Sequence, residues 1–280
     1  MLSLVAFVRV EARTANPLLP RALFTSTRRN LALLTILLAS AAGAATNFFL
    51  SLFLQQIRGL TPLQTSAYFL PMLLIAGAGT VAGRWMRRAG PIRVAAAGLA
   101  GAALGLLLLA LWMGGEGPTT VAPHLPLDGL PEASAVAETP DDGARARPAR
   151  LAGDANRSWR VGLAGLIMFP FGLGLSFAGA AVAALGGVPD HRRGVAGGVV
   201  NTAMEVGPTV GLAALVALSR VKADAMVQTG ASWARATAAG YSLALATAAS
   251  LFALLAMGLF AAHRRATATR RASTNRRRQF

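Results

Sequence analysis

The chain has 280 residues, of which 54% are hydrophobic and only 14% are charged, and its mean hydropathy is +0.52. Because a soluble domain carries about 25% charged residues, this composition leaves too little polar surface for a water-soluble body of this size. It rules out disorder overall, disfavours a soluble enzyme and predicts a polytopic helical membrane protein. The absence of cysteine excludes disulfides, thiolate metal sites and cysteine nucleophiles.

Six stretches are uncharged or nearly so and reach the ~20 residues that a helix needs to cross a bilayer. In chain order they are 30–57, 59–83, 94–115, 161–189, 194–219 and 236–262. Thr61 followed by Pro62 predicts an N-cap with proline in the first turn of the second span. Pro71, Pro170 and Pro208 lie inside spans, where neighbouring helices can satisfy the backbone groups that a proline frees.

The spans divide the chain into five segments. These are a cytoplasmic N-terminal segment (1–29), helices one to three (30–115), an external loop (116–160), helices four to six (161–262) and a basic cytoplasmic tail (263–280). The apolar residues before Arg9 are too few to span and look like the end of a preceding helix. The loop holds six prolines and seven acidic residues, which predicts a flexible segment. The tail holds seven arginines, and we expect it to be disordered and to anchor to anionic lipid head groups.

Arginine and lysine are sorted between alternate loops. Six spans put both termini on one side, where 18 of these residues fall, against nine on the other side. With the acidic residues included, the two sides carry net charges of +16 and +1. The positive-inside rule therefore predicts a multi-pass protein of the cell membrane with both termini in the cytoplasm. A nucleic-acid-binding protein would not sort its arginines in this way, so we expect no nucleic-acid partner.

Four segments in register with these spans resemble a known family. They are NPLLPRALF (16–24), FFLSLFLQQ (48–56) running into GLTPLQ (59–64), GRWMRRAG (83–90) and RGVAGGVVNT (193–202). In this order and spacing they resemble the C-terminal half of the major facilitator superfamily, and within it the fourteen-span EmrB/QacA-type drug:proton antiporters. Each motif alone is weak, and the resemblance covers nearly the whole chain except the long loop.

The resemblance implies an all-α membrane protein with six transmembrane helices in two three-helix inverted repeats, which is half of the family's fold. It implies a secondary transporter without cofactors that works by alternating access and exports a small amphipathic organic compound in exchange for protons. Because the family's molecules have two six-helix halves, the chain would need a second half or a second copy of itself. Its partners would thus be the lipid bilayer, the substrate, protons and that second half.

The segment from Gly83 to Gly90 resembles the signature loop between the family's second and third helices. Its glycines would permit a tight turn, and an arginine such as Arg88 could engage a helix end or an acidic partner. Arg87 stands where the family has an aspartate. The alternative is that Arg84, Arg87, Arg88 and Arg93 only anchor the cytoplasmic side.

Glu205 is the one charged side chain in the interior of a predicted span. A carboxylate at the centre of a membrane helix costs ~2.5–3.5 kcal/mol on insertion scales, so such residues usually face a cavity or a partner. It lies about 16 Å into the fifth span, near the midplane. Asn201 and Thr209 lie four residues on either side and share its face. These three residues predict a polar path for protons or substrate; the alternative is a protonated glutamate hydrogen-bonded between helices.

The fifth span also contains Gly207, Pro208 and Gly211. The sequence around them resembles the family's antiporter motif, which normally lies in the N-terminal half. Gly207 and Gly211 form a small-xxx-small pair that permits close helix packing, and packing alone explains them as well as a role in preventing leak. Gly101 and Gly105 of the third span show the same spacing.

The sequence contains no catalytic constellation and no metal site. His124, His191 and His263 lie in or beside loops and are far apart, and none is paired with a spaced carboxylate and histidine. The protein is therefore expected not to be an enzyme. Besides the transporter half, one alternative stays open, namely a truncated or degenerate membrane protein without transport of its own, or an interaction subunit of another membrane protein.

Overall fold

The computed structural model describes Arg9 and residues 24–115 and 148–277, with helix as the only regular secondary structure in these ranges. The long helices are α2 (Thr27–Leu52, continued by a π-helical turn over Phe53–Ile57), α4 (Leu74–Ala89), α5 (Pro91–Gly115), α6 (Pro148–Leu185), α7 (Arg193–Gln228) and α8 (Trp233–Arg277). Short elements join them: α3 (Pro62–Ala67) and 3-10 turns over Leu70–Leu73 and Asp190–Arg192. The expected all-α class is therefore confirmed.

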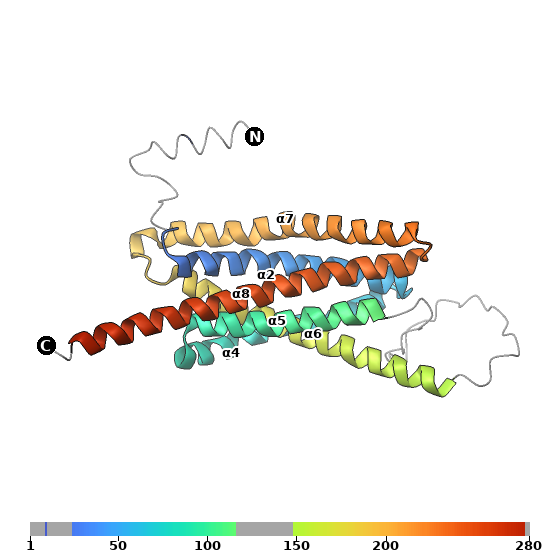
Figure 1. Ribbon diagram of the computed structural model, residues 1–280, viewed down its shortest axis with the longest axis horizontal. Helices are drawn as coiled ribbons and strands as arrows, with labels where there is room; N and C mark the ends of the chain where they lie inside the picture. The colour runs from blue at the N-terminus through green and yellow to red at the C-terminus, as the bar shows by residue number, and fades with distance from the viewer. Residues whose placement is uncertain (1–8, 10–23, 116–147, 278–280) are drawn as a thin grey trace, which may run out of the picture.

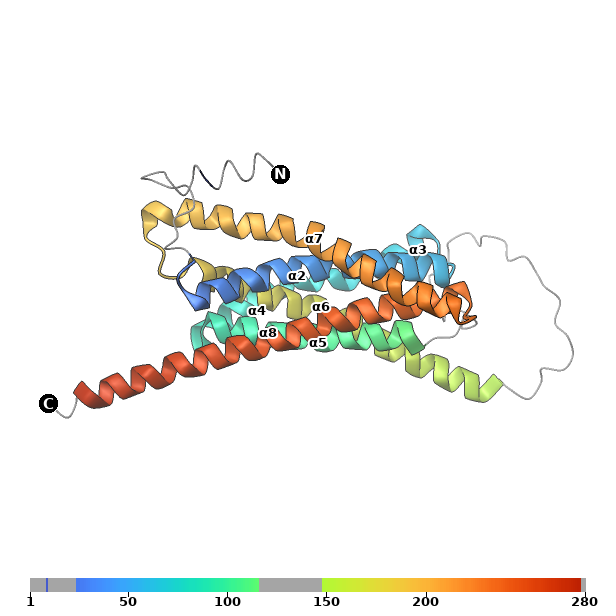
Figure 2. The same cartoon turned by 45° about the horizontal axis from the view of Figure 1, so that its top comes forward.

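The long helices lie lengthwise in one bundle and alternate in direction along the chain (Figures 1 and 2). One end holds the beginnings of α2, α5 and α7 and the ends of α4, α6 and α8; it lies to the left in Figure 1. We call it the arginine-rich end, because it carries Arg28, Arg29, Arg84, Arg87, Arg88, Arg93, Arg192, Arg193 and Arg264. The helix directions thus gather the arginines of alternate loops at one end, as the charge count predicted.

Five helical segments are long and apolar enough to cross a membrane: Thr27–Ile57, Pro62–Ala89, Pro91–Gly115, Ser158–Leu185 and Trp233–Arg264. They correspond to five of the six predicted spans. The remaining one, predicted over 194–219, is helical as α7 but is not among these five. Asn201, Thr202, Glu205 and Thr209 lie within this predicted span and lower its hydropathy. Its crossing of the membrane stays a prediction.

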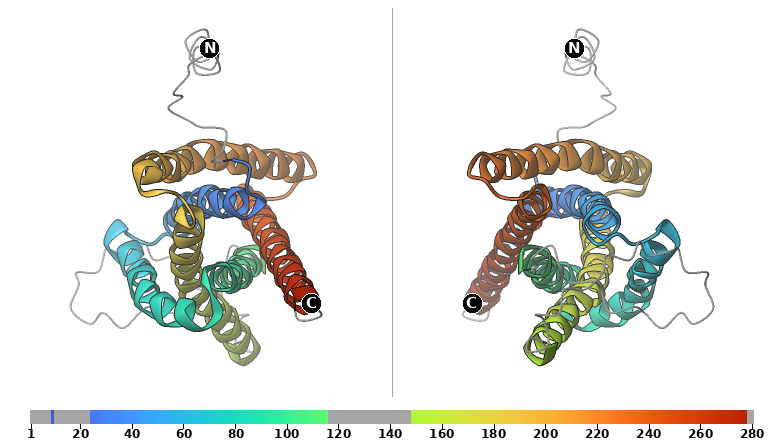
Figure 3. Two further views of the ribbon diagram at one scale, coloured as in Figure 1. Left: turned by 90° about the vertical axis from the view of Figure 1, so that its left-hand side faces the viewer. Right: turned by 90° about the vertical axis from the view of Figure 1, so that its right-hand side faces the viewer.

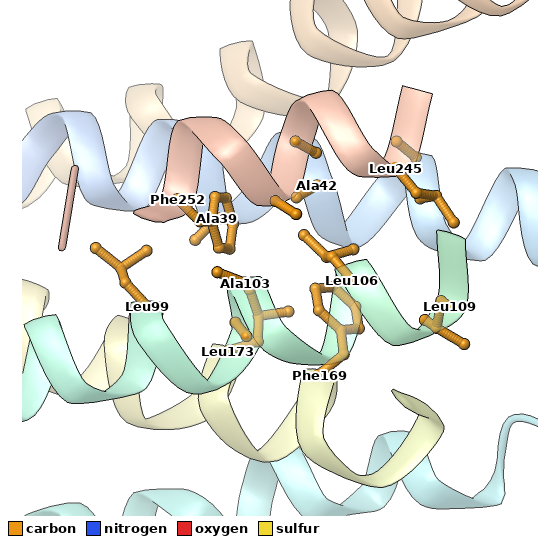
Figure 4. Close-up of a cluster of buried hydrophobic side chains, with 14 of the residues drawn as sticks. Ala39, Ala42, Leu99, Ala103, Leu106, Leu109, Phe169, Leu173, Leu245 and Phe252 are labelled. Atoms are coloured by element: carbon orange, nitrogen blue, oxygen red, sulfur yellow. The ribbon is translucent and has the colours of Figure 1, made fainter. Parts of the chain in front are cut away.

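The core lies where α2, α5, α6 and α8 meet (Figure 4). Large side chains from three of these helices fill it, among them Leu106, Phe169 and Phe252, and alanines of α2 such as Ala39 and Ala42 face them. These residues are at most 2% exposed. Small residues on one helix opposite large residues on the next let the helix axes approach closely, which is the main source of attraction between helices in a bilayer.

A glycine seam joins α5 to α6. Gly165, Gly172 and Gly179 recur every seven residues along α6, and Gly98 and Gly105 do so along α5. A Cβ atom built on Gly172 would lie 2.6 Å from the Gly98 carbonyl oxygen, and one on Gly179 would lie 2.6 Å from the Pro91 carbonyl oxygen. The two backbones therefore touch over several turns, and a seven-residue repeat suits the slight left-handed crossing of such pairs.

The second predicted span begins as expected and then differs. Thr61 caps α3 with a full capping box, because its hydroxyl accepts from the Gln64 amide at 3.3 Å while the Gln64 side chain accepts from the Thr61 amide at 3.0 Å. The helix then breaks around Pro71, where a 3-10 turn replaces it. Proline lacks the amide proton that a continuous α-helix needs at this position. Pro170 and Pro208, in contrast, lie within unbroken helices.

Two predicted non-helical segments are partly helical. The loop predicted over 116–160 is helix from Pro148 onward, while 116–147 lies outside the described residues. The tail predicted as disordered over 263–280 continues α8 to Arg277, and its last three residues lie outside the description. Both corrections have one cause: these segments are rich in alanine and arginine, which have high intrinsic helix propensity, and each directly adjoins a membrane-length helix that nucleates it.

Candidate functional site: the polar face of α7

α7 lies on one side of the bundle, where it packs on α2 and α8 (Figure 3). Its two small-xxx-small glycines form the contact with α2. A Cβ atom built on Gly207 would collide with the Ser40 hydroxyl and the Leu37 carbonyl oxygen, and one on Gly211 would collide with the Ala41 side chain. The Ser40 hydroxyl also lies 3.4 Å from the Ala203 carbonyl oxygen, which it can reach as a donor. Close packing therefore accounts for Gly207 and Gly211.

The predicted polar residues occupy the opposite face of α7. Asn201, Glu205 and Thr209 are all exposed on the outside of this bundle. Successive members are four residues apart and so lie one turn above another. The Thr209 hydroxyl donates to the Glu205 carbonyl oxygen at 3.2 Å. Thr202, which the sequence argument did not single out, is exposed beside them and bonds in the same way to the Gly198 carbonyl oxygen at 2.9 Å.

This polar face contrasts with the exposed faces of α5 and α8. Leu104, Leu107 and Leu111 form the exposed strip of α5, and Leu254 and Met257 belong to that of α8. Such apolar strips suit contact with lipid chains. An exposed carboxylate one third of the way along α7 does not, because charged groups within a bilayer need a partner or a water-filled cavity. On α7 the polar residues are exposed together with the apolar Met204, Val206 and Val210, so this side of the helix is mixed in character.

Pro208 follows Gly207 on α7 without breaking the helix. Proline at this position cannot donate to the carbonyl of Met204, so one backbone acceptor is available next to Glu205. The sequence Gly207-Pro208 thus joins two features in consecutive residues: contact with α2 on one side and a gap in the helix hydrogen bonds beside the polar face. Both features are compatible with the packing role and with the antiporter-like role.

The signature segment over 83–90 differs from the expected loop. Residues up to Ala89 belong to α4, so Gly83 is helical and only Gly90 turns the chain, with φ at +83°. The correction follows from the arginines. They have a high helix propensity, and their positive charge interacts favourably with the negative C-terminal end of the helix dipole. Arg87 donates to the Gly83 carbonyl oxygen at 3.3 Å. Arg88 lies at the helix end, exposed, with no acidic partner among the described residues.

The sequence argument missed an aromatic cluster at the end opposite the arginine-rich end. The Arg58 guanidinium lies 5.5 Å from the ring centres of both Phe53 and Trp112. Trp159 lies edge-on to Trp112 at 6.3 Å and to Tyr68 at 5.5 Å. Burial lowers the pKa of Arg58 from its ordinary value. These five residues come from several separate segments of the chain, so no spacing in the sequence could have predicted the cluster.

Within the residues that the structure describes, no three histidine or acidic side chains come together as a metal site would require. The carboxylates in these ranges are Asp154, Asp190, Glu205 and Asp224, and Asp190 pairs with Arg193 at 3.1 Å. Glu205 therefore has no second carboxylate beside it among the described residues.

Helices of membrane length joined by small-residue seams define an all-α membrane protein. Comparison with known sequences agrees, because residues 2–127 match the Major Facilitator Superfamily. The match covers the segment before α2 and the helices through α5. The match covers less than half of the chain and shows a similarity to this family over that part.

Curated relatives include antibiotic resistance and export proteins of actinobacteria. The puromycin resistance protein of Streptomyces alboniger is 27% identical over 92% of this chain and 45% of its own length. The cephamycin export protein of Amycolatopsis lactamdurans is 39% identical over 38% of this chain and 22% of its own length. The multidrug resistance protein Stp of Mycobacterium tuberculosis is 26% identical over 75% of this chain and 31% of its own length. The chain thus spans less than half the length of these relatives.

Proposed function

We propose that this chain forms one six-helix half of a secondary transporter that exports a small amphipathic organic compound in exchange for protons by alternating access. The half would correspond to the C-terminal half of a fourteen-span antiporter. Matching relatives named for drug resistance and export support the substrate class. In the proposed orientation both termini and the arginine-rich end face the cytoplasm.

The observation that carries the proposal is the exposed face of Asn201, Glu205 and Thr209 on α7. Against lipid this face would cost several kcal/mol. Against a second six-helix half it would line an aqueous path between the halves instead. Glu205 could then bind a proton when the path opens to one side of the membrane and release it when the path opens to the other. Coupling of transport to protons requires such an exchange. A second half, or a second copy of this chain, therefore completes the site.

The absence of cysteine makes the partner surface directly testable. Single cysteines at Asn201 or Thr209 should form cross-links with a partner half, or with a second copy, in native membranes. Leu107→Cys on α5 is the matched control, because it is comparably exposed but lies on an apolar strip. If Leu107→Cys cross-links as much as the cysteines at Asn201 and Thr209, or if it alone cross-links, the polar face is not the partner surface.

Proton coupling is tested at Glu205 itself. Glu205→Gln keeps the shape and hydrogen bonding but removes ionisation, so substrate-induced proton flux in proteoliposomes of the complete transporter should be abolished. Asp224→Asn is the matched control, since Asp224 is the other carboxylate of α7 and lies near its far end. We expect it to keep the flux. If Glu205→Gln keeps both the flux and its pH profile, Glu205 is not the coupling group.

A further inference from the structure

The last turns of α4 carry three arginines and a tryptophan around one open hollow. The hollow has a volume of about 550 Å³ and is lined by Arg84, Trp85, Arg87 and Arg88. All four side chains are exposed, and Trp85 is 46% exposed. The segment is therefore more than a basic loop, because its three guanidinium groups and its indole ring line the same hollow.

We propose that this hollow binds the phosphate head group of an anionic phospholipid from the leaflet at the arginine-rich end. Guanidinium groups bind phosphate oxygens through paired, charge-assisted hydrogen bonds. Tryptophan prefers the membrane–water boundary, where its ring meets the glycerol and upper chain region while its N–H stays in polar surroundings. The proposal does not depend on the transport function.

The charges of Arg84 and Arg88 are available to an external anion. These residues are four apart and lie on one face of α4, and no described side chain pairs with either. Arg87 is bent back onto the Gly83 carbonyl oxygen at 3.3 Å, which keeps it at the edge of the hollow. Among the described residues the arginine-rich end offers one carboxylate, Asp190, and Arg193 already pairs with it.

The surface that leads into the hollow suits a lipid chain. Leu73, the last residue of the 3-10 turn, and Leu74, the first of α4, are exposed, and Gly77 and Thr80 continue the exposed surface toward Arg84. A Cβ atom built on Gly77 would meet nothing within 4 Å, so the helix surface is open there. Leu74 lies ten residues before Arg84, or about 15 Å along α4, which is comparable with one leaflet of the hydrocarbon core. The Thr80 hydroxyl bonds to the Gly77 carbonyl oxygen at 2.8 Å and is thereby satisfied within the helix, so a lipid chain could lie along this open surface from the two leucines to the cationic hollow.

The test is retention of lipid by the purified full chain, measured by native mass spectrometry after extraction from membranes of phosphatidylglycerol and phosphatidylcholine. We expect the wild-type chain to retain phosphatidylglycerol selectively. The double variant Arg84→Gln, Arg88→Gln should lower this retention about tenfold or more, since it removes two guanidinium groups that would donate charge-assisted hydrogen bonds to the phosphate. Arg192→Gln, Arg193→Gln removes the same charge at the same end but away from the hollow, and should change retention less than twofold.

Two further measurements distinguish specific binding in the hollow from non-specific attraction between the basic surface and anionic lipids. Quenching of Trp85 fluorescence by phosphatidylglycerol with brominated chains should exceed quenching by brominated phosphatidylcholine, and inorganic phosphate should not reverse it. Arg84→Lys, Arg88→Lys, which keeps the charge, should retain more lipid than the glutamine variant. Equal loss of lipid in the hollow variant and the control pair, or equal retention of both lipids by the wild-type chain, would overturn the proposal. Reversal by phosphate would assign the hollow to a soluble anion instead.

Discussion

Gly207 of α7 lies so close to Ser40 of α2 that a Cβ atom at position 207 would collide with the Ser40 hydroxyl. The contact fixes which side of α7 faces the bundle and, because Glu205 lies about 200° away around the helix, which side faces outward. The packing glycines and the polar face are therefore two consequences of one helix orientation. A residue that changes the contact should disturb the polar face as well.

Gly207→Ala should destabilise the protein by about 1–3 kcal/mol, because the added methyl group forces α7 away from the Leu37 carbonyl and the Ser40 hydroxyl. Gly198→Ala on the same helix is the control, since a Cβ atom there meets nothing within 4 Å. Replacing an open helical glycine by alanine should stabilise slightly. Thermal unfolding in mild detergent compares the two variants. Equal stability of both would show that α7 does not pack on α2 in this register.

The glycines of α5 give a second matched pair. A Cβ atom on Gly105 would lie within 2.8 Å of the Phe169 side chain and closer still to its backbone, whereas on Gly101 the nearest atom, the Gly172 Cα, is 3.8 Å away. We expect Gly105→Ala to lower the unfolding temperature and Gly101→Ala to leave it nearly unchanged. The sequence spacing treats the two glycines alike, so the difference tests the structure alone. A similar decrease in both variants would contradict the α5–α6 seam.

Most of the fold could be predicted because it follows from local chemistry. Long apolar runs become helices in a bilayer, and Thr61 with Pro62 and Gln64 begins α3 through a capping box. Helix ends were predicted less well, since the extent of α6 and α8 beyond the apolar runs depends on helix propensity that polarity alone does not show. The break at Pro71 could not be predicted, because Pro170 and Pro208 lack the same amide proton and yet lie within unbroken helices.

The candidate site was predictable in its composition but not in its contacts. The four-residue spacing of Asn201, Glu205 and Thr209 suffices to place them on one face. That this face points out of the bundle depends on Gly207 meeting Ser40, two residues 167 positions apart. The aromatic cluster around Arg58 depends likewise on contacts between distant segments. Pairings of this kind follow from the packed structure rather than from any periodicity.

Topology can be tested without purification. A reporter fused at Ala135, in the predicted external loop, and one fused after Phe280 should report opposite sides of the membrane. The physical reason is the sorting of 18 arginine and lysine residues to the side of the termini against nine on the other. Activity of both reporters on the same side would contradict the six-span arrangement and, in particular, the crossing of α7.

Arg58→Gln should destabilise the end of the bundle opposite the arginine-rich end. The guanidinium lies 5.5 Å from the centres of two rings, Phe53 of the π-helical turn and Trp112 of α5. It thereby holds the end of α2 against α5. Loss of both cation–π contacts should cost about 1–2 kcal/mol, near the upper end for such pairs because the site is partly buried.

The readouts for Arg58→Gln are thermal unfolding and the fluorescence of Trp112, whose emission should shift to longer wavelength as water enters the cluster. Arg58→Lys should recover part of the loss, because an ammonium group keeps the charge but stacks less well on a ring. Arg160→Gln serves as the control, since Arg160 is exposed at the same end and has no ring contact among those described. If Arg160→Gln lowers stability as much as Arg58→Gln, the effect reflects charge at this end of the bundle and the rings do not hold Arg58.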